Sequence, residues 1–243
     1  MESGPLLRLL IQAGLGSRRR LADAIEQGRV RVNGDVTEDF SYLVNVEKDT
    51  VTVDGEEVDL KPKPLVYLML NKPAAVLSTT KDERGRKTVM DLLPPKYGAM
   101  RLYPVGRLDR DSTGLLLLTN DGELTYRLTH PKFEHEREYL VFIRDKLRPG
   151  EKQTIETGIQ LDDGITHHAV VKELQAYHPF NYSVTVHEGR KRQVRRMFGK
   201  LGHPVLALKR IRVGDLKLGK LQEAQARELT VEEIKALLLE CSH

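Results

Sequence analysis

A short polar loop that opens directly into an apolar strand is the feature that most constrains this chain. Residues 106–114 read GRLDRDSTG, followed by four leucines, Leu115–Leu118, and by TNDG at 119–122. The leucines indicate a strand of the core. Asp109 is therefore expected at the rim of a sheet, held by a scaffold, which suits a catalytic carboxylate. The alternative is that Asp109 only caps a turn.

Composition predicts a soluble globular protein. The 243 residues suffice for one large or two small domains, and hydrophobic residues make up 40% and charged residues 30% of the chain. No apolar run is long enough to cross a bilayer, and Met1–Pro5 lacks the features of a signal peptide. The single cysteine, Cys241, allows no disulfide within the chain. We expect a cytoplasmic protein with no membrane partner.

The distribution of charge is more informative than the net charge of +4. Between residues 187 and 220, eleven Lys and Arg face only Glu188 and Asp215, which leaves +9. Residues 8–31 carry six Arg against Asp23 and Glu26, which leaves +4. Either segment alone could be a solvated face, but two separate basic segments favour nucleic acid as the partner.

The N-terminal region predicts a small αβ domain. An apolar helix begins at Leu6 and ends near Gly14, and a second helix spans 18–27, between Ser17 as N-cap and Gly28 as stop signal. Strands around residues 30–32 and 51–53 each run into a hairpin signal, Asn33-Gly34 and Asp54-Gly55. The sequence 61–64, KPKP, favours an extended linker. We therefore expect a first domain at 1–60 and a second at 65–243.

The second domain is predicted to be a mixed α/β domain, so that the whole chain is of the α+β class. Candidate strands lie at 65–70, 115–118, 139–143 and 182–186. The clearest helix is 193–201, because Val194, Met197, Phe198 and Leu201 share one face. A capping box at Thr230–Glu233 opens a last amphipathic helix through Leu239.

The GRLD and GLLLLTNDG segments at 106–122 resemble the signature of the pseudouridine synthases, in particular the RsuA/RluB-type branch that modifies ribosomal RNA. SRRR at 17–20 and RVRVNG at 29–34 resemble an S-four-type RNA-binding domain. The resemblance implies a mainly antiparallel catalytic sheet joined by the proline-containing linker to that small domain. It also implies isomerisation of one uridine in ribosomal RNA, with large-subunit RNA favoured by the EGRKRQVRRM sequence at 188–197.

The resemblance assigns three catalytic residues. Asp109 matches the essential aspartate, which acts either by covalent attack or by removing a ribose proton. Tyr139 matches a tyrosine that offers a stacking face to the flipped uracil, and Arg195 matches the arginine that pairs with the aspartate. A fixed cation there would keep Asp109 ionised. Arg196 is the competing candidate for that arginine, and Tyr139 could instead be an ordinary core residue.

RNA contacts are expected from a further set of cations. Arg107 would enter the space that the flipped base leaves, or would contact a phosphate. The remaining candidates are Arg18, Arg19, Arg20, Arg31, Lys72, Arg190, Arg192 and Arg196. The NKPAAV segment at 71–76 departs from its family motif at Ala75, where glycine is usual. Either the backbone angle there is ordinary or the loop shifts.

Two other functions compete with this interpretation. A ribosome-assembly factor could bind RNA without turnover, although it would have no evident use for Asp109, Tyr139 and Arg195 together. Glycoside hydrolysis by Asp109 and Asp111 is the weaker alternative, because two carboxylates in one loop do not flank a bond. We expect no metal and no cofactor, ribosomal RNA or its assembly intermediates as partner, and a monomer.

Overall fold

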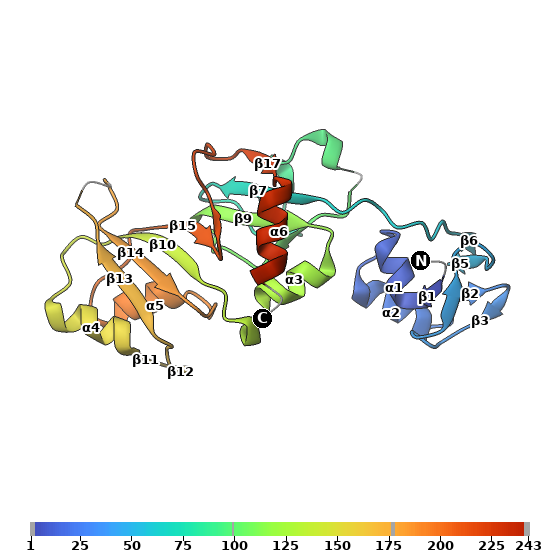
Figure 1. Ribbon diagram of the computed structural model, residues 1–243, viewed down its shortest axis with the longest axis horizontal. Helices are drawn as coiled ribbons and strands as arrows, with labels where there is room; N and C mark the ends of the chain where they lie inside the picture. Colours follow the sequence, from blue (N-terminus) through green and yellow to red (C-terminus); the bar gives the residue numbers. More distant parts are fainter. Residues whose placement is uncertain (1–2, 99, 176–177, 241–243) are drawn as a thin grey trace. The chain divides into compact units, whose positions relative to one another are not determined.

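The computed structural model describes residues 3–98, 100–175 and 178–240, with side chains through residue 238 (Figure 1). The chain divides into two compact units, Met1–Leu65 and Val66–His243. Residues 58–66 contain no helix or strand, and Cys241 lies outside the described residues. Within the described ranges, no helix has both the length and the apolar character that spanning a membrane requires.

The first unit packs two helices on small sheets. The helices are α1 (Leu6–Gln12) and α2 (Arg18–Glu26). Strands β3 (Asp35–Val36), β2 (Val30–Val32), β5 (Val51–Val53) and β6 (Glu56–Glu57) form one antiparallel sheet in that order, and β1 (Ser3–Pro5) pairs with β4 (Leu43–Asn45). Both predicted hairpins form, because Asn33-Gly34 and Asp54-Gly55 adopt the positive φ that such turns need.

The second unit is built on one mixed, mainly antiparallel sheet, which confirms the predicted fold class. Its strand order is β13-β14-β10-β15-β9-β7-β17, with β16 on β15 and β8 on β9. The strands are β7 (Tyr67–Lys72), β8 (Tyr103–Val105), β9 (Thr113–Thr119), β10 (Arg137–Phe142), β13 (Ala169–Glu173), β14 (Tyr182–Val186), β15 (Ala207–Val213), β16 (Leu216–Lys217) and β17 (Ala226–Glu228); β11 (Gln160–Leu161) and β12 (Gly164–Ile165) form a separate hairpin.

Strand β9 is covered on both faces, which explains its unbroken run of leucines. Leu115 and Leu117 pack with residues of α3 (Gly122–Thr129) and α6 (Val231–Glu240), and Figure 1 shows α6 in front of the β7 and β9 region with α3 beside its lower end. Leu116 and Leu118 face the opposite cluster, which includes residues of the short 3-10 helices η1 (Val89–Leu92) and η2 (Pro95–Tyr97). A strand whose two faces are both covered favours apolar side chains at successive positions.

The other half of the sheet carries α4 (Pro149–Thr157) and α5 (Gln193–Lys200). The predicted apolar face of α5 is confirmed, since Val194, Met197 and Phe198 are buried against β10, β13 and β14. Leu201 packs partly buried against the same cluster. This core fixes the first turn of α5, and the arginines beside it, relative to the sheet.

The two halves meet where β15 lies parallel to β9, pairing Lys209 with Thr113 and Arg210 with Gly114. Gly114 has φ +101°, and a Cβ there would come within 3 Å of the Arg210 backbone. The Arg210 side chain is buried and donates from Nε to the Leu115 carbonyl at 2.8 Å. A glycine is therefore required for the strands to approach this closely.

This close approach yields a stability prediction. Gly114→Ala should lower the free energy of unfolding by at least about 3 kcal/mol, because the methyl group overlaps backbone and the φ angle disfavours alanine. Chemical denaturation of both proteins measures the difference. Gly199→Ala in α5 is the matched control, since a Cβ there meets no atom within 4 Å, and it should change stability by less than about 1 kcal/mol. Equal effects would contradict the packing argument.

Candidate active site and RNA-binding surfaces

Hydrogen bonds to backbone groups of residues 108–112 hold the loop that carries Asp109. The Ser112 amide donates to the Asp109 carbonyl at 3.1 Å, which closes a turn. The buried Ser78 hydroxyl accepts from the Leu108 amide at 3.2 Å and donates to the Leu108 carbonyl at 2.9 Å. Leu108 is itself buried in the core. It therefore fixes the positions of its two neighbours, the exposed Arg107 and the half-buried Asp109.

Ala75 braces the same turn from the preceding loop. Its amide donates to the Arg110 carbonyl at 2.8 Å, and its own φ is +65°. The backbone angle at Ala75 is therefore not an ordinary one. The alanine adopts the left-handed conformation that glycine would take without strain, at a cost of about 1 kcal/mol.

Lys72 supports the turn from beneath. Its side chain is 0% exposed, and its ammonium donates to the carbonyls of Ser112 at 2.8 Å and Pro73 at 2.9 Å. Burial lowers its pKa to about 8, although the charges of Asp111, Asp109 and Glu223 oppose the shift. The expected contact between Lys72 and RNA is thus corrected: a fully buried ammonium does not reach a phosphate, and Lys72 acts inside the loop.

Arg192 is the cation nearest to the Asp109 carboxylate. The two side chains form an ion pair at 3.5 Å, and the same guanidinium donates to both Asp111 oxygens at 3.2 and 3.3 Å. Arg192 stands immediately before α5 with φ +52°, a conformation that turns the chain into the helix. The sequence predicted Arg192 as an RNA contact, whereas the structure has it join the aspartate loop to α5.

Arg195 reaches the same loop from one turn further along α5. It lies 3.3 Å from the Asp111 carboxylate and donates to the carbonyls of Asp111 at 3.0 Å and Val205 at 2.8 Å and to the Ser112 hydroxyl at 3.3 Å. Among the described residues, no ion pair within 4 Å joins Arg195 to Asp109. The expected direct pairing is therefore replaced by an indirect one, through Asp111. The buried Arg195 Nε has no hydrogen-bond partner among the described residues.

Asp111 is the member of the site that sequence reasoning missed. Partial burial opposes its ionisation, but hydrogen bonds from Arg192 and the charge of Arg195 outweigh burial and lower its pKa. Asp111 is thus a fixed anion that holds both arginines beside Asp109. Its spacing of two residues from Asp109 is the signal in the sequence, where it suggests only a second catalytic carboxylate.

Tyr139 lies in line with this loop across the sheet. The paired residues Tyr139, Arg210, Gly114 and Lys72 stand side by side on β10, β15, β9 and β7. A bulge between Glu138 and Tyr139 interrupts the pairing of β10 with β15, and such bulges re-aim side chains. The half-buried Tyr139 packs against the core clusters of both halves, including the one that contains Leu108.

The other arginines of the 188–197 segment are largely used within the fold. Arg196 forms a two-bonded ion pair with Asp163 at 2.8 and 2.9 Å, which directs it away from the Asp109 loop. Arg190 binds Glu188 at 2.8 Å and three backbone carbonyls at 163–165. Arg195 rather than Arg196 is thus the arginine at the site. The exposed Arg107 has no hydrogen bond or ion pair with any described residue.

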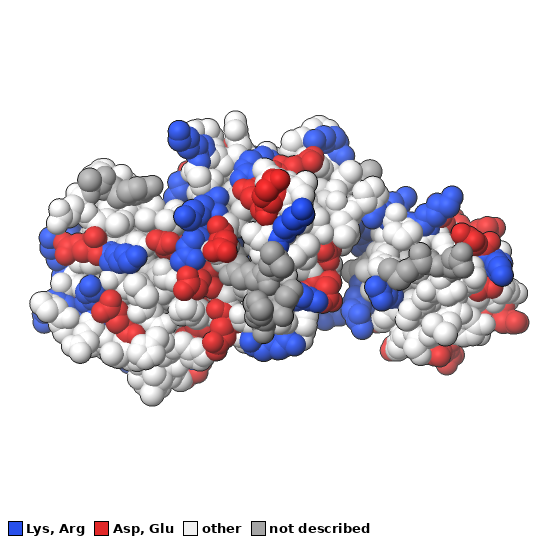
Figure 2. Space-filling view, viewed as in Figure 1, with Lys and Arg blue, Asp and Glu red and all other residues white. Residues whose placement is uncertain are grey.

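The first unit presents its own row of cations. Ser17 caps α2 by accepting from the Arg20 amide at 3.2 Å, as predicted. Arg18, Arg19 and Arg20 are exposed in the first turn, where amide groups also favour anions. Arg31 is exposed as well and donates to the Gly34 carbonyl at 2.9 Å. Figure 2 shows Lys and Arg over the helical side of this unit.

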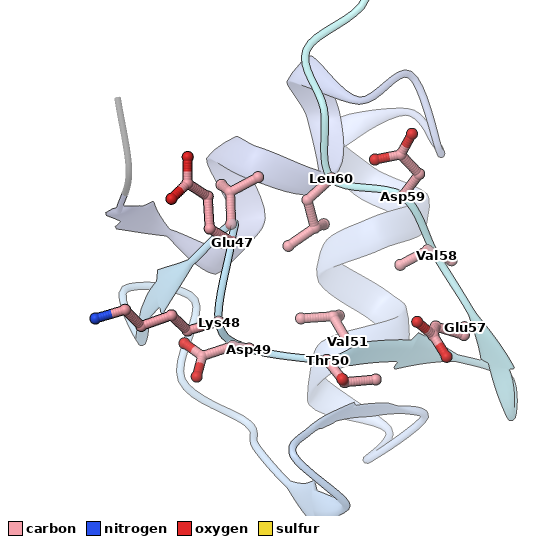
Figure 3. A pocket seen from close by; sticks show the side chains of 10 residues that line it. Glu47, Lys48, Asp49, Thr50, Val51, Glu57, Val58, Asp59 and Leu60 are labelled. Atoms are coloured by element: carbon pink, nitrogen blue, oxygen red, sulfur yellow. The ribbon is translucent and has the colours of Figure 1, made fainter.

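Acidic side chains occupy a different part of the same unit. They surround a hollow of about 480 Å³ with an apolar floor that includes Val51 and Leu60 (Figure 3). Its carboxylates belong to Glu47, Asp49, Glu57 and Asp59. Because these anions repel phosphate, a polyanion is expected to approach the helix start rather than this hollow.

Comparison with known proteins places this architecture among the pseudouridine synthases. Residues 66–200 match the family model for RNA pseudouridylate synthase, and residues 5–51 match the S4 domain. The chain belongs to the RNA pseudouridylate synthase family and is an enzyme that isomerises uridine to pseudouridine in RNA. These matches confirm the predicted resemblance to the pseudouridine synthases and to the S4-type RNA-binding domain.

Similar proteins match nearly the whole chain. The ribosomal large subunit pseudouridine synthase B of Bacillus subtilis is 41% identical over 98% of this chain and 97% of its own length. An uncharacterized RNA pseudouridine synthase of Aquifex aeolicus is 40% identical over 95% and 92%. A crystal structure of a pseudouridylate synthase superposes with a TM-score of 0.68 at 32% identity, covering 96% of this chain and 99% of that one.

Ala75 supplies a second stability prediction. Ala75→Gly should raise the free energy of unfolding by about 0.5–1 kcal/mol, because relief of the left-handed strain exceeds the entropy that glycine adds to the unfolded chain. Thermal or chemical denaturation measures the change. Ala74→Gly, at the neighbouring exposed position, is the control and should destabilise. A loss of stability in Ala75→Gly would mean that the positive φ angle of Ala75 does not destabilise the folded state.

Lys72 supplies a prediction on pH. The pKa of Lys72 falls from 10.5 to about 8 on folding, so between these values the folded state binds fewer protons than the unfolded chain. The contribution of Lys72 to stability therefore rises with pH across that window and is lost as the pH falls through 8. The unfolding free energy of the wild type minus that of Lys72→Met should grow by roughly 2–3 kcal/mol over this range.

The control for this titration is Lys191→Met, which removes an exposed lysine. Its unfolding free energy should stay within about 0.5 kcal/mol of the wild type, as is usual for surface substitutions. A difference for Lys72→Met that does not grow between pH 8 and pH 10.5 would contradict the lowered pKa of the buried ammonium.

Proposed function

We propose that this enzyme converts a specific uridine of ribosomal RNA, in the large subunit, to pseudouridine. The observation that carries the site assignment is the Asp109 carboxylate, placed on a rigid turn and paired with Arg192. The choice of substrate is supported by the full-length similarity to a Bacillus subtilis protein named as a large-subunit synthase. The proposed partner is ribosomal RNA or an assembly intermediate, met in the cytoplasm by a monomeric enzyme.

The reaction requires the bond between uracil N1 and ribose C1′ to break and a bond between C5 and C1′ to form. No atoms are gained or lost overall, because the proton removed from C5 is balanced by the one that N1 acquires. Asp109 acts beside C1′, by attack on carbon or by removal of a ribose proton, and both roles require the ionised carboxylate. The Arg192 guanidinium forms an ion pair with this carboxylate at 3.5 Å.

The surrounding residues hold the extruded nucleotide. Tyr139 offers a ring for stacking and a hydroxyl for the transfer of the C5 proton. Arg195 keeps the loop in place through its ion pair with Asp111 at 3.3 Å. Arg107, exposed and unpaired among the described residues, fills the stack that the base has left. The arginines of α2 add affinity through phosphates.

Deletion and complementation test this function. Cells that lack the protein should lose one pseudouridine of large-subunit RNA, mapped at single-nucleotide resolution. Wild-type protein should restore it, and Asp109→Asn should not, because the amide cannot serve as nucleophile or base. RNA affinity of Asp109→Asn should remain within about threefold of the wild type, since the change removes no cation and no stacking group.

Asp145→Asn is the matched control, because it neutralises an exposed carboxylate outside the site, and it should restore the modification fully. Turnover by Asp109→Asn would remove Asp109 from its role. A deletion strain that keeps every pseudouridine, with RNA binding intact, would favour the non-catalytic assembly factor.

A further inference from the structure

Residues 126–133, which follow strand β9 in the chain, bring three aromatic rings together at the surface. The ring centroid of Tyr126 lies 4.9 Å from that of His130 and 6.0 Å from that of Phe133, and the His130 and Phe133 centroids are 6.3 Å apart. Phe and Tyr make up only 5% of this chain, which has no Trp. A three-ring cluster within eight residues is therefore a concentrated feature, referred to below as the 126–133 platform.

The platform is exposed and carries a cation. Tyr126 is 46% exposed, and His130 is exposed as well. The Lys132 ammonium lies 5.4 Å from the Tyr126 ring centroid and 4.6 Å from that of Phe133. Rings that served only to fill the core would be buried, whereas these keep open surface beside a positive charge.

The platform is anchored to the catalytic strand β10. Phe133 stacks on the buried His135 at 6.2 Å, with 29° between the ring planes. Arg137 donates to the carbonyls of Leu128, within the segment, at 2.9 Å and of His135, just after it, at 3.1 Å. Arg137 precedes Tyr139 by two residues on β10, which fixes the platform relative to the site.

The platform also adjoins the aspartate loop directly. A Cβ added at Gly106 would lie 3.6 Å from the Cγ2 of Thr129, at the end of α3. Gly106 is the residue before Arg107, the side chain proposed to enter the RNA stack. The segment that carries the rings therefore borders the place where RNA must open.

We propose that the 126–133 platform binds an unpaired nucleotide of the RNA next to the extruded uridine, with its base stacked on Tyr126 and its phosphate near Lys132. The inference rests on the proposed function, because it takes RNA as the substrate at Asp109. Single-stranded segments are recognised by aromatic stacking combined with cations. The platform supplies an aromatic ring and a cation, and the proximity of Thr129 to Gly106 places them beside the loop that carries Arg107.

The test uses full-length Asp109→Asn protein, which binds without turnover, and a short single-stranded oligouridylate carrying one 2-aminopurine. Tyr126→Leu should weaken binding about tenfold and abolish the fluorescence quenching that stacking causes. Tyr126→Phe, which keeps the ring, should bind within about twofold of the parent. Val170→Ala, at a residue that is also 46% exposed, is the control and should change neither readout.

Salt dependence separates stacking from charge. Lys132→Gln should reduce the slope of log affinity against log salt by about one, whereas Tyr126→Leu should leave that slope unchanged. Unchanged affinity and quenching in Tyr126→Leu would overturn the proposal, and so would an equal loss in Tyr126→Phe. Failure of the ribosomal assignment is distinguishable, because a deletion strain would then keep its pseudouridines while Tyr126→Leu still weakened binding to the oligouridylate.

Discussion

The close approach of β15 to β9 at Gly114 is the constraint on which the site depends. Asp109 belongs to the half of the sheet built on β7 and β9, whereas Arg192 and Arg195 belong to the half that carries α5. The two halves are joined where Arg210 pairs with Gly114. A side chain at position 114 would separate the strands and move the arginines away from the carboxylates they hold.

The cations around this junction differ in how deeply they are buried. Lys72 is fully buried and binds backbone carbonyls, Arg195 is partly buried and binds Asp111, and Arg192 is exposed and spans Asp109 and Asp111. Burial therefore decides what each cation does: the innermost, Lys72, supports the loop, and the outermost, Arg192, faces the Asp109 carboxylate. Because Asp111 neutralises part of this positive charge, the arginines remain in place before RNA arrives.

Local signals predicted much of the fold. The hairpins at Asn33-Gly34 and Asp54-Gly55 form because these residues tolerate positive φ. The Thr230–Glu233 capping box forms with both of its hydrogen bonds, at 2.9 and 3.2 Å. The sequence pattern puts the first strand of the second unit at 65–70, two residues early, because β7 begins at Tyr67 and extends through the polar Asn71 and Lys72. Their burial depends on distant backbone partners that no local pattern reveals.

The sequence by itself determined the family resemblance, the amphipathic face of α5 and the polar loop that carries Asp109 ahead of a buried strand. These follow from spacing, turn chemistry and hydrophobic period, which act within a few residues. Only the tertiary structure decided which cation serves which carboxylate. Arg192, Arg195 and Arg196 are near neighbours in sequence, yet the first two reach the Asp109 loop and the third reaches Asp163. The direction of each side chain is set by the helix axis and by contacts between strands far apart in the chain.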